Sequence, residues 1–190
     1  MKKALMSATL GLSVIATSLG ISASASAYTL VNYATLYNQY PQKQSCLALK
    51  AGTANDGQPF IVYHCDGTAS QAFSNSIYPG FSVTSPSVGV SSPIWNQAGN
   101  HQGVSVGNDA TNDGAPVVLW SEFFTSSPGQ FWRPDATNSP ASGCYRFINP
   151  NSGKALGAAG GSMADGTAVI IWADSWKNPV THPDQYWCVR

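Results

Sequence analysis

Charged side chains are scarce in this sequence, and the two signs balance. Among 190 residues there are nine Lys and Arg and nine Asp and Glu, and charged residues make up only 9% of the chain. Binding of nucleic acid or of an anionic membrane surface requires a basic face. The chain has too few cations to build one, so we expect neither a nucleic-acid partner nor membrane insertion.

A long apolar stretch occurs only near the amino terminus. Met1–Lys3 is basic, an apolar run extends from Ala4 to about Ile21, and alternating small residues end at Ala27. This order predicts a secretory signal peptide over 1–27, cleaved after Ala27, and a secreted, extracellular and bacterial protein. A membrane anchor is the alternative, but Gly, Ser and Thr dilute the run and no basic cluster follows it.

Motifs of the common enzyme and cofactor sites are missing. The sequence has no Gly-x-Ser-x-Gly, no His-Glu-x-x-His, no Cys-x-x-Cys and no phosphate-binding Gly-x-x-x-x-Gly-Lys. The three histidines, His64, His101 and His182, are far apart. Nine acidic residues leave a carboxylate pair for glycoside hydrolysis open, although most of them lie in turn sequences. We therefore expect no enzyme, no metal site and no cofactor.

Four cysteines remain after the predicted cleavage: Cys46, Cys65, Cys144 and Cys188. An even number of cysteines in an exported chain indicates disulfides. Three pairings are possible, and we favour Cys46–Cys65 and Cys144–Cys188.

A threefold internal repeat is the main positive feature of the sequence. Each repeat has two apolar residues and an Asn, an Asp-Gly pair, an aromatic six residues after the Asp-Gly, and a Gln-x-aromatic triplet. In chain order these markers are Leu36-Tyr37-Asn38, Asp56-Gly57, Tyr63 and Gln71-Ala72-Phe73; Ile94-Trp95-Asn96, Asp113-Gly114, Trp120 and Gln130-Phe131-Trp132; Phe147-Ile148-Asn149, Asp165-Gly166, Trp172 and Gln185-Tyr186-Trp187. The 163 residues after the signal peptide divide into repeats of about 54, over approximately 28–84, 85–140 and 141–190. One domain, 28–190, therefore uses up the mature chain.

Short apolar runs broken by turn residues predict four strands in each repeat. The runs are Leu36–Asn38, Cys46–Leu49, Phe60–His64 and Gln71–Phe73; Ile94–Asn96, Val104–Val106, Val117–Trp120 and Gln130–Arg133; Tyr145–Asn149, Ala155–Ala158, Ala168–Trp172 and Gln185–Val189. Twelve strands with threefold symmetry predict an all-β fold, the β-trefoil. A propeller would need more than three blades.

These markers resemble the repeat of the ricin B-type β-trefoil lectins over the whole mature chain. The likeness is clearest at the Cys46-Leu47-Ala48-Leu49 and Ile61-Val62-Tyr63-His64-Cys65 segments, whose cysteine spacing follows the family, and at Lys154-Ala155-Leu156-Gly157. The resemblance implies a carbohydrate-binding protein for galactose-type or other sugars. It also allows a role as the glycan-binding subunit of a separate toxin or enzyme chain.

The resemblance implies that the middle aromatics Tyr63, Trp120 and Trp172 stack on sugar rings, whereas Phe73, Trp132 and Trp187 fill the core. The alternative for the middle aromatics is packing between repeats. The chain departs from the family where the pocket carries an Asp, because Ala48, Ser105 and Gly157 stand there. Only Ser105 of these keeps a hydrogen-bonding side chain.

The third repeat has the most candidates to replace the missing carboxylate, Asp174 and Asp184. Trp172, Trp176 and Gln185 lie near them in the sequence. We expect the third repeat to be the best site, followed by the second with Trp120, Ser105 and Gln130, and then the first with Tyr63. The missing Asp also favours a rival hypothesis, a trefoil protein ligand such as a protease inhibitor with degenerate sugar sites.

Overall fold

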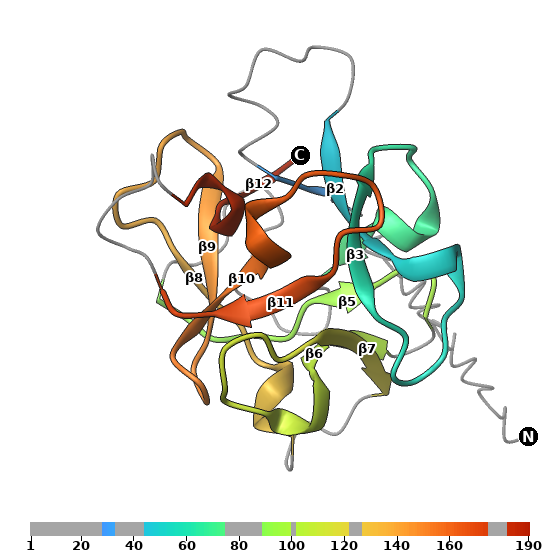
Figure 1. Ribbon diagram of the computed structural model, residues 1–190, viewed down its shortest axis with the longest axis horizontal. Helices are drawn as coiled ribbons and strands as arrows, with labels where there is room; N and C mark the ends of the chain where they lie inside the picture. Colours follow the sequence, from blue (N-terminus) through green and yellow to red (C-terminus); the bar gives the residue numbers. More distant parts are fainter. Residues whose placement is uncertain (1–27, 33–43, 75–88, 100–101, 122–126, 175–181) are drawn as a thin grey trace, which may run out of the picture.

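The protein is a β-trefoil in the computed structural model (Figure 1), which describes residues 28–32, 44–74, 89–99, 102–121, 127–174 and 182–190. Six strands are arranged as a ring. They are β1 (Leu30–Asn32), β4 (Phe73–Ser74), β5 (Trp95–Asn96), β8 (Arg133–Asp135), β9 (Cys144–Asn149) and β12 (Trp187–Val189). Antiparallel pairing follows the order β1, β12, β9, β8, and separately β5, β4. The bridges Ser92–Trp132 and Tyr28–Phe73 join these two parts, which closes a barrel.

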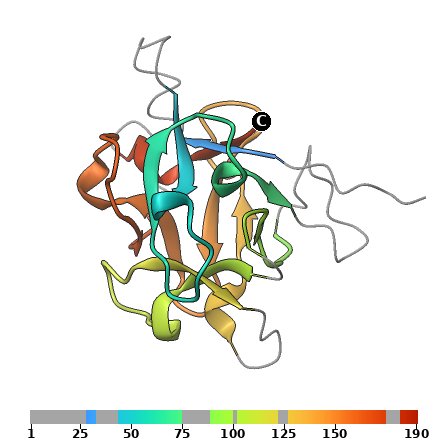
Figure 2. The same cartoon turned by 90° about the vertical axis from the view of Figure 1, so that its right-hand side faces the viewer.

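Three hairpins surround one end of this barrel, one from each repeat (Figure 1). They are β2 (Ser45–Leu49) with β3 (Phe60–His64), β6 (Gln102–Val106) with β7 (Val117–Ser121), and β10 (Lys154–Ala158) with β11 (Val169–Trp172). Figure 2 turns the first of them, coloured cyan to teal, toward the viewer. Single bridges connect each hairpin to the other two, at Pro59–Val118, Ile61–Ala168 and Pro116–Ile170.

Two short 3-10 turns flank the outer face of each hairpin. Those after the second strand are η1 (Lys50–Gly52), η3 (Gly107–Asp109) and η5 (Ala159–Gly161); those before the fourth strand are η2 (Ala69–Gln71), η4 (Pro128–Gln130) and η6 (Pro183–Gln185). The glutamines of the Gln-x-aromatic triplets, predicted as strand residues, end the second set of turns. Their strands begin only after the turn, since the 3-10 turn satisfies the backbone locally.

The aromatic residues of the triplets fill the barrel, as predicted. Phe73, Trp132 and Trp187 are fully buried. The indole Nε1 of Trp132 donates to the carbonyl of Val104 at 2.8 Å, and that of Trp187 donates to the carbonyl of Leu156 at 3.0 Å. A buried indole therefore keeps a hydrogen-bond partner in both repeats, which avoids a desolvation cost of about 1–3 kcal/mol.

The first strand differs from the expectation. β1 is Leu30–Asn32, a segment that the sequence analysis did not identify, and it pairs with β2 as β5 and β9 pair with β6 and β10. The predicted strand Leu36–Asn38 lies outside the described residues. The Asn marker has a structural role in the other two repeats, because the Nδ2 of Asn96 donates to the carbonyl of Ser70 and that of Asn149 to the carbonyl of Phe131.

Both favoured disulfides are present in the structure. Cys46–Cys65 joins β2 to the residue after β3, and Cys144–Cys188 joins β9 to β12. The second bond therefore connects the beginning and the end of the third repeat through directly paired residues of two neighbouring strands. Within the described part of the chain, no helix has the length and apolar character needed to cross a membrane.

Candidate functional site

The three middle aromatics lie at or near the ends of β3, β7 and β11, away from the barrel core. Tyr63 and Trp120 are half-buried, and Trp172 is 47% exposed. An aromatic of this size is normally buried, because its ring carries a large apolar surface. Their exposure makes them available as platforms for a ligand.

The strand that carries each middle aromatic accepts a backbone hydrogen bond from the Asp-Gly turn of another repeat, namely the preceding one around the symmetry axis. Gly57, Gly114 and Gly166 donate their N–H groups to the carbonyls of Leu119, Ile171 and Val62, each in the strand of a middle aromatic. A Cβ on Gly57 would lie 3.8 Å from the Trp120 ring, and one on Gly114 would lie 3.8 Å from the Trp172 ring. Packing between repeats, the alternative for these residues, therefore occurs together with their exposure.

The aspartates of these turns add side-chain contacts. Asp56 accepts hydrogen bonds from the N–H and the hydroxyl of Ser121, and Asp165 accepts one from the N–H of His64 at 2.7 Å and lies 2.8 Å from its Nδ1. Ser121 and His64 directly follow Trp120 and Tyr63. In these two repeats the Asp of the Asp-Gly turn therefore also fixes the strand of the neighbouring aromatic, whereas Asp113 forms an ion pair with Lys154 at 2.6 Å.

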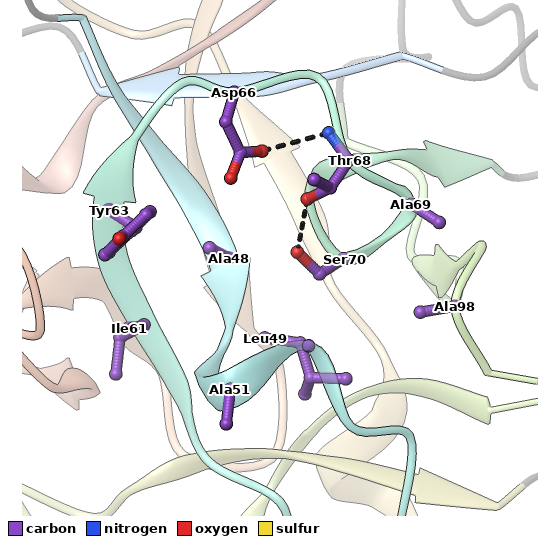
Figure 3. Close-up of a pocket in the computed structure, with 11 residues that line it drawn as sticks. Ala48, Leu49, Ala51, Ile61, Tyr63, Asp66, Thr68, Ala69, Ser70 and Ala98 are labelled. Carbon is purple, nitrogen blue, oxygen red and sulfur yellow. Dashed lines mark hydrogen bonds between the residues drawn. The ribbon is translucent and has the colours of Figure 1, made fainter.

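The first repeat has a cavity of about 500 Å³ beside Tyr63 (Figure 3). Its floor and walls come from the β2–β3 hairpin and from η1 and η2. The lining residues are Ala48, Leu49, Ala51, Gly52, Ile61, Tyr63, Asp66, Thr68, Ala69, Ser70 and Ala98. In Figure 3 the Tyr63 ring stands on one side, and the polar side chains of Asp66, Thr68 and Ser70 lie around the opposite edge.

The polar edge of this cavity is pre-arranged. The carboxylate of Asp66 accepts the N–H of Thr68 at 2.9 Å, and the hydroxyls of Thr68 and Ser70 are 2.8 Å apart. The hydrogen bond from the Thr68 N–H lowers the pKa of Asp66, and the nearby His64 acts in the same direction. Asp66 is therefore ionised at neutral pH and is a strong acceptor for hydroxyl groups.

No carboxylate stands at the three positions where the family carries its pocket Asp. Ala48, Ser105 and Gly157 occupy equivalent places in β2, β6 and β10, opposite Ile61, Val118 and Ile170. Ser105 is 4% exposed, and its hydroxyl donates to the carbonyl of Val106. The structure therefore gives Ser105 a backbone partner and little access to a ligand.

The glutamines of the triplets serve the backbone. Gln130 and Gln185 are 2% exposed, and their Nε2 groups donate to the carbonyls of Ser121 and Ala173. Gln71 does the same for His64 and also accepts the N–H of Asp66 at 2.8 Å. These side chains connect the end of the third strand of each repeat, or the residue just after it, to the 3-10 turn that follows. We therefore leave Gln130 and Gln185 out of the proposed ligand contacts.

The two acidic candidates of the third repeat lie in different environments. Asp174 forms an ion pair with Arg146, a residue 1% exposed in β9, and Arg146 also pairs with Asp135 at 2.9 Å. Asp184 instead lies against Gly157 of β10, because a Cβ on that glycine would be 3.2 Å from its carboxylate oxygen Oδ2. Burial raises the pKa of Asp184, although a backbone hydrogen bond and the nearby His182 oppose this effect.

Asp174 and Asp184 thus belong to separate groups of contacts. The cavity described above lies in the first repeat, which the sequence ranked last. Trp176 lies outside the described residues, as do 122–126 and 175–181, which follow Trp120 and Trp172. Of the residues that line the first cavity, sequence reasoning suggested only Tyr63 as a ligand contact and placed Ala48 where the family carries its pocket Asp. It missed Asp66 and Thr68, whose signal was their place between the aromatic and the Gln. Among the described residues, no three His, Cys, Asp or Glu are grouped as metal ligands.

Comparison with known proteins agrees with this architecture. A family model described as ricin-type β-trefoil lectin domain-like matches residues 93–172, which confirms the resemblance to ricin B-type lectins in the second and third repeats. The designed three-fold symmetric protein ThreeFoil superposes with a TM-score of 0.66 and 22% identity, covering 86% of this chain and 96% of its own. No curated protein matches the sequence.

Two natural proteins show the same fold. A ricin B-like lectin from Macrolepiota procera, in complex with lactose, aligns with a TM-score of 0.59 and 16% identity over 87% of this chain and 95% of its own. An exo-β-1,3-galactanase from Clostridium thermocellum aligns with a TM-score of 0.67 and 17% identity over 88% of this chain but 30% of its own. At these identities the structural likeness establishes the β-trefoil fold.

Proposed function

We propose that this protein is a secreted lectin that binds sugar rings in shallow pockets beside its middle aromatics. The lectin-like family match supports carbohydrate binding rather than catalysis. The proposal concerns glycans as a class, with galactose-type sugars as the first candidates. Tyr63, Trp120 and Trp172 are the proposed stacking residues, one in each repeat.

The observation that carries this proposal is the cavity of the first repeat. An aromatic ring on one side suits the apolar C–H face of a sugar, and a polar edge on the other side suits its hydroxyls. Asp66 can accept hydrogen bonds from two neighbouring hydroxyls, while Thr68 and Ser70 can both donate and accept. The volume of about 500 Å³ lies within the range of small-molecule sites.

Each pocket is expected to bind a monosaccharide weakly, with a Kd of about 0.1–1 mM, because a single sugar buries little surface. Several pockets on one domain can bind a glycan-covered surface together. The effective affinity then rises by about two to four orders of magnitude without new contacts.

The direct test replaces the stacking residue of the first repeat. Tyr63→Ala removes the ring, and Tyr63→Phe is the matched control because it keeps the ring and loses only the hydroxyl. We expect Tyr63→Ala to weaken binding at this pocket at least tenfold in a glycan array followed by calorimetry with the best ligand, and Tyr63→Phe to change it less than threefold. Trp120→Ala and Trp172→Ala test the other repeats in the same way. If all three Ala variants bind like wild type, the site assignment is wrong.

We further propose that residues 1–27 direct export and are removed. Tyr28, the residue after the proposed cleavage site, already belongs to the fold, because its N–H donates to the carbonyl of Phe73 at 2.8 Å. Two disulfides also fit an oxidising compartment. Amino-terminal sequencing of protein from the culture medium should begin at Tyr28. Protein that stays in the cell with Met1 intact would contradict this proposal.

A role as the glycan-binding subunit of a separate enzyme or toxin is a finer part of the proposal. The chain covers 30% of the galactanase and 17% of a protein described as a mosquitocidal holotoxin, so both combine this fold with other parts. Co-purification from native culture medium tests this idea. A chain that elutes alone under conditions that preserve complexes would count against it.

The rival is a trefoil that binds proteins, such as a protease inhibitor. It is favoured by the absence of the family's pocket Asp at Ala48, Ser105 and Gly157. A galactose-agarose column separates the two hypotheses. Elution by free sugar supports the lectin, whereas flow-through fractions that inhibit a protease support the rival.

A further inference from the structure

In each repeat, the two 3-10 turns lie beside the place that corresponds to the cavity of the first repeat. In the first repeat η1 contributes Gly52 to the cavity, and η2 contributes Ser70. The three turns after the second strand share an unusual backbone. Their middle residues, Ala51, Asn108 and Gly160, have φ of 57°, 54° and 62°; their last residues, Gly52, Asp109 and Gly161, have φ of 64°, 51° and 69°. Gly52, Asp109 and Gly161 are therefore structural counterparts.

The turns before the fourth strand give a second set of counterparts, because each ends with the Gln of its triplet. Ser70, Gly129 and Asp184 directly precede that Gln. The first and second sets face one another. In the second repeat the pair is Asp109 and Gly129, and in the third it is Gly161 and Asp184. Aspartate and glycine have exchanged places across the same contact.

The second repeat holds its carboxylate on the η3 side. The Oδ1 of Asp109 accepts the N–H of Gly129 at 2.7 Å. A Cβ on residue 129 would lie 2.5 Å from that oxygen, so the carboxylate position requires Gly129. Asp109 itself adopts a positive φ, which is tolerated by Asp but is satisfied at no cost by Gly in the other two repeats. Residue 109 is therefore an Asp at a backbone conformation that favours Gly.

The third repeat holds its carboxylate on the η6 side. The Oδ2 of Asp184 lies 3.2 Å from the place of a Cβ on Gly157, and its Oδ1 lies 3.8 Å from the place of a Cβ on Gly161. Gly157 is the counterpart of Ala48, which lines the cavity of the first repeat. The carboxylate of Asp184 therefore lies at the counterpart of the cavity floor, in space that a side chain at 157 would occupy.

We propose that Asp109 in the second repeat accepts sugar hydroxyls in place of the Asp missing at Ser105. Of the two candidates that the sequence offered in the third repeat, we propose that Asp184, and not Asp174, does the same in place of the Asp missing at Gly157. This inference rests on the proposed function, and it names the hydroxyl-binding groups of those two sites. The two carboxylates come from opposite sides of the turn contact. The pockets beside Trp120 and Trp172 therefore present the charge from different directions and select different pairs of hydroxyls, so their sugar preferences differ.

The test uses the full secreted chain and the indole N–H resonances of Trp120 and Trp172, one reporter for each site. Galactose, N-acetylgalactosamine and xylose are titrated separately. Asp109→Asn is the key variant, because its side-chain oxygen still accepts the Gly129 N–H and Asn also tolerates the positive φ. A purely structural role of Asp109 survives this change, whereas a sugar-binding role is weakened, because the amide oxygen lacks the charge that strengthens hydrogen bonds from hydroxyls. We expect about tenfold weaker binding at Trp120 with Trp172 unaffected. Asp184→Asn should show the reverse.

A double variant, Asp109→Gly with Gly129→Asp, transfers the arrangement of the third repeat to the second. We expect it to bind at Trp120 with the sugar preference that wild type shows at Trp172. Asp109→Gly alone, which matches the glycines of the other two repeats, should melt within a few degrees of wild type and bind poorly at Trp120. Binding at Trp120 that stays within twofold in Asp109→Asn overturns the inference and leaves the lectin proposal standing. Sugars that perturb neither indole in wild type overturn the proposed sites in these repeats and the inference with them.

Discussion

Replacement of Arg146 by Met should destabilise the protein strongly. Arg146 is 1% exposed, and its guanidinium lies between Asp135 of β8 and Asp174, which follows β11. It also lies 5.8 Å from the centre of the Tyr186 ring. Met has a similar length and fills the space, but it leaves two carboxylates without their cation.

The size of the effect follows from how far these carboxylates are buried. Removal of one partner of a fully buried ion pair costs about 3–5 kcal/mol. Asp135 and Asp174 are 15% and 22% exposed, so water reaches them in part. We therefore expect a loss near the lower limit, about 3 kcal/mol, and a Tm lower by about 6–12 °C for a chain of this size. Urea unfolding followed by tryptophan fluorescence, together with calorimetry, measures both quantities.

The pH dependence gives a second check. Burial by itself would raise the pKa of Asp135, but hydrogen bonds from Thr137 and the positive charges of Arg146 and Arg133 hold it below its ordinary value. A lowered pKa stabilises the fold above the ordinary Asp value, and this contribution is lost as the pH falls through the lower, folded-state pKa. The Met variant should lose less stability between neutral pH and that value than wild type does.

The control replaces all three charges. Arg146→Met with Asp135→Asn and Asp174→Asn keeps the volumes and removes the unpaired carboxylates, and it should return to within about 1 kcal/mol of wild type. A single variant that loses less than about 1 kcal/mol would refute this account of the cluster. So would a triple variant as unstable as the single one.

Two further predictions concern the third repeat and the disulfides. Asp184→Asn should raise the Tm at pH 7, because burial raises the pKa of Asp184 and the fold disfavours its ionised form; the gain should disappear once the pH falls below the ordinary pKa of Asp, and an equal gain at all pH values would contradict this cause. Removal of Cys144–Cys188 by double Ala replacement should cost about 4 kcal/mol and removal of Cys46–Cys65 about 3 kcal/mol, since their sequence separations are 44 and 19. Denaturant unfolding of both variants measures the two losses of stability, and a larger loss for Cys46–Cys65 would contradict this prediction.

The sequence predicted the fold well because the trefoil repeats its chemistry. Trp132 and Trp187 occupy the same barrel position and donate to the same backbone place in their repeats. The first strand was harder to predict. Leu36-Tyr37-Asn38 resembles the marker and lies nearer to Asp56 than Leu30–Asn32 does, yet the pairing of β1 with β12 and β2 defines the strand. Strand pairing between the two ends of the chain cannot be read from local pattern.

The site was predicted less completely, because residue type does not reveal where a side chain points. Gln130, Gln185 and Asp174 have suitable groups for binding sugars, but backbone carbonyls and Arg146 occupy them. Asp109 lies in a turn sequence typical of any loop. Its relation to Gly129 becomes visible only when η3 and η4 are placed side by side. Long-range contacts therefore decide which polar residues remain for a ligand.

The Asp-Gly turns explain how the fold can be uniform while the sites differ. Each turn holds the aromatic strand of the next repeat through backbone hydrogen bonds at Gly57, Gly114 and Gly166, so the cycle of support closes through the three repeats. The pocket edges come from other segments, the 3-10 turns, which make none of these three hydrogen bonds. Substitutions there, such as the exchange of Asp and Gly between 109 and 129 or 161 and 184, can change the ligand contacts without disturbing the barrel. A single domain of this fold can thus vary the polar groups at its three pocket positions, provided that its Asp-Gly turns and barrel aromatics are kept.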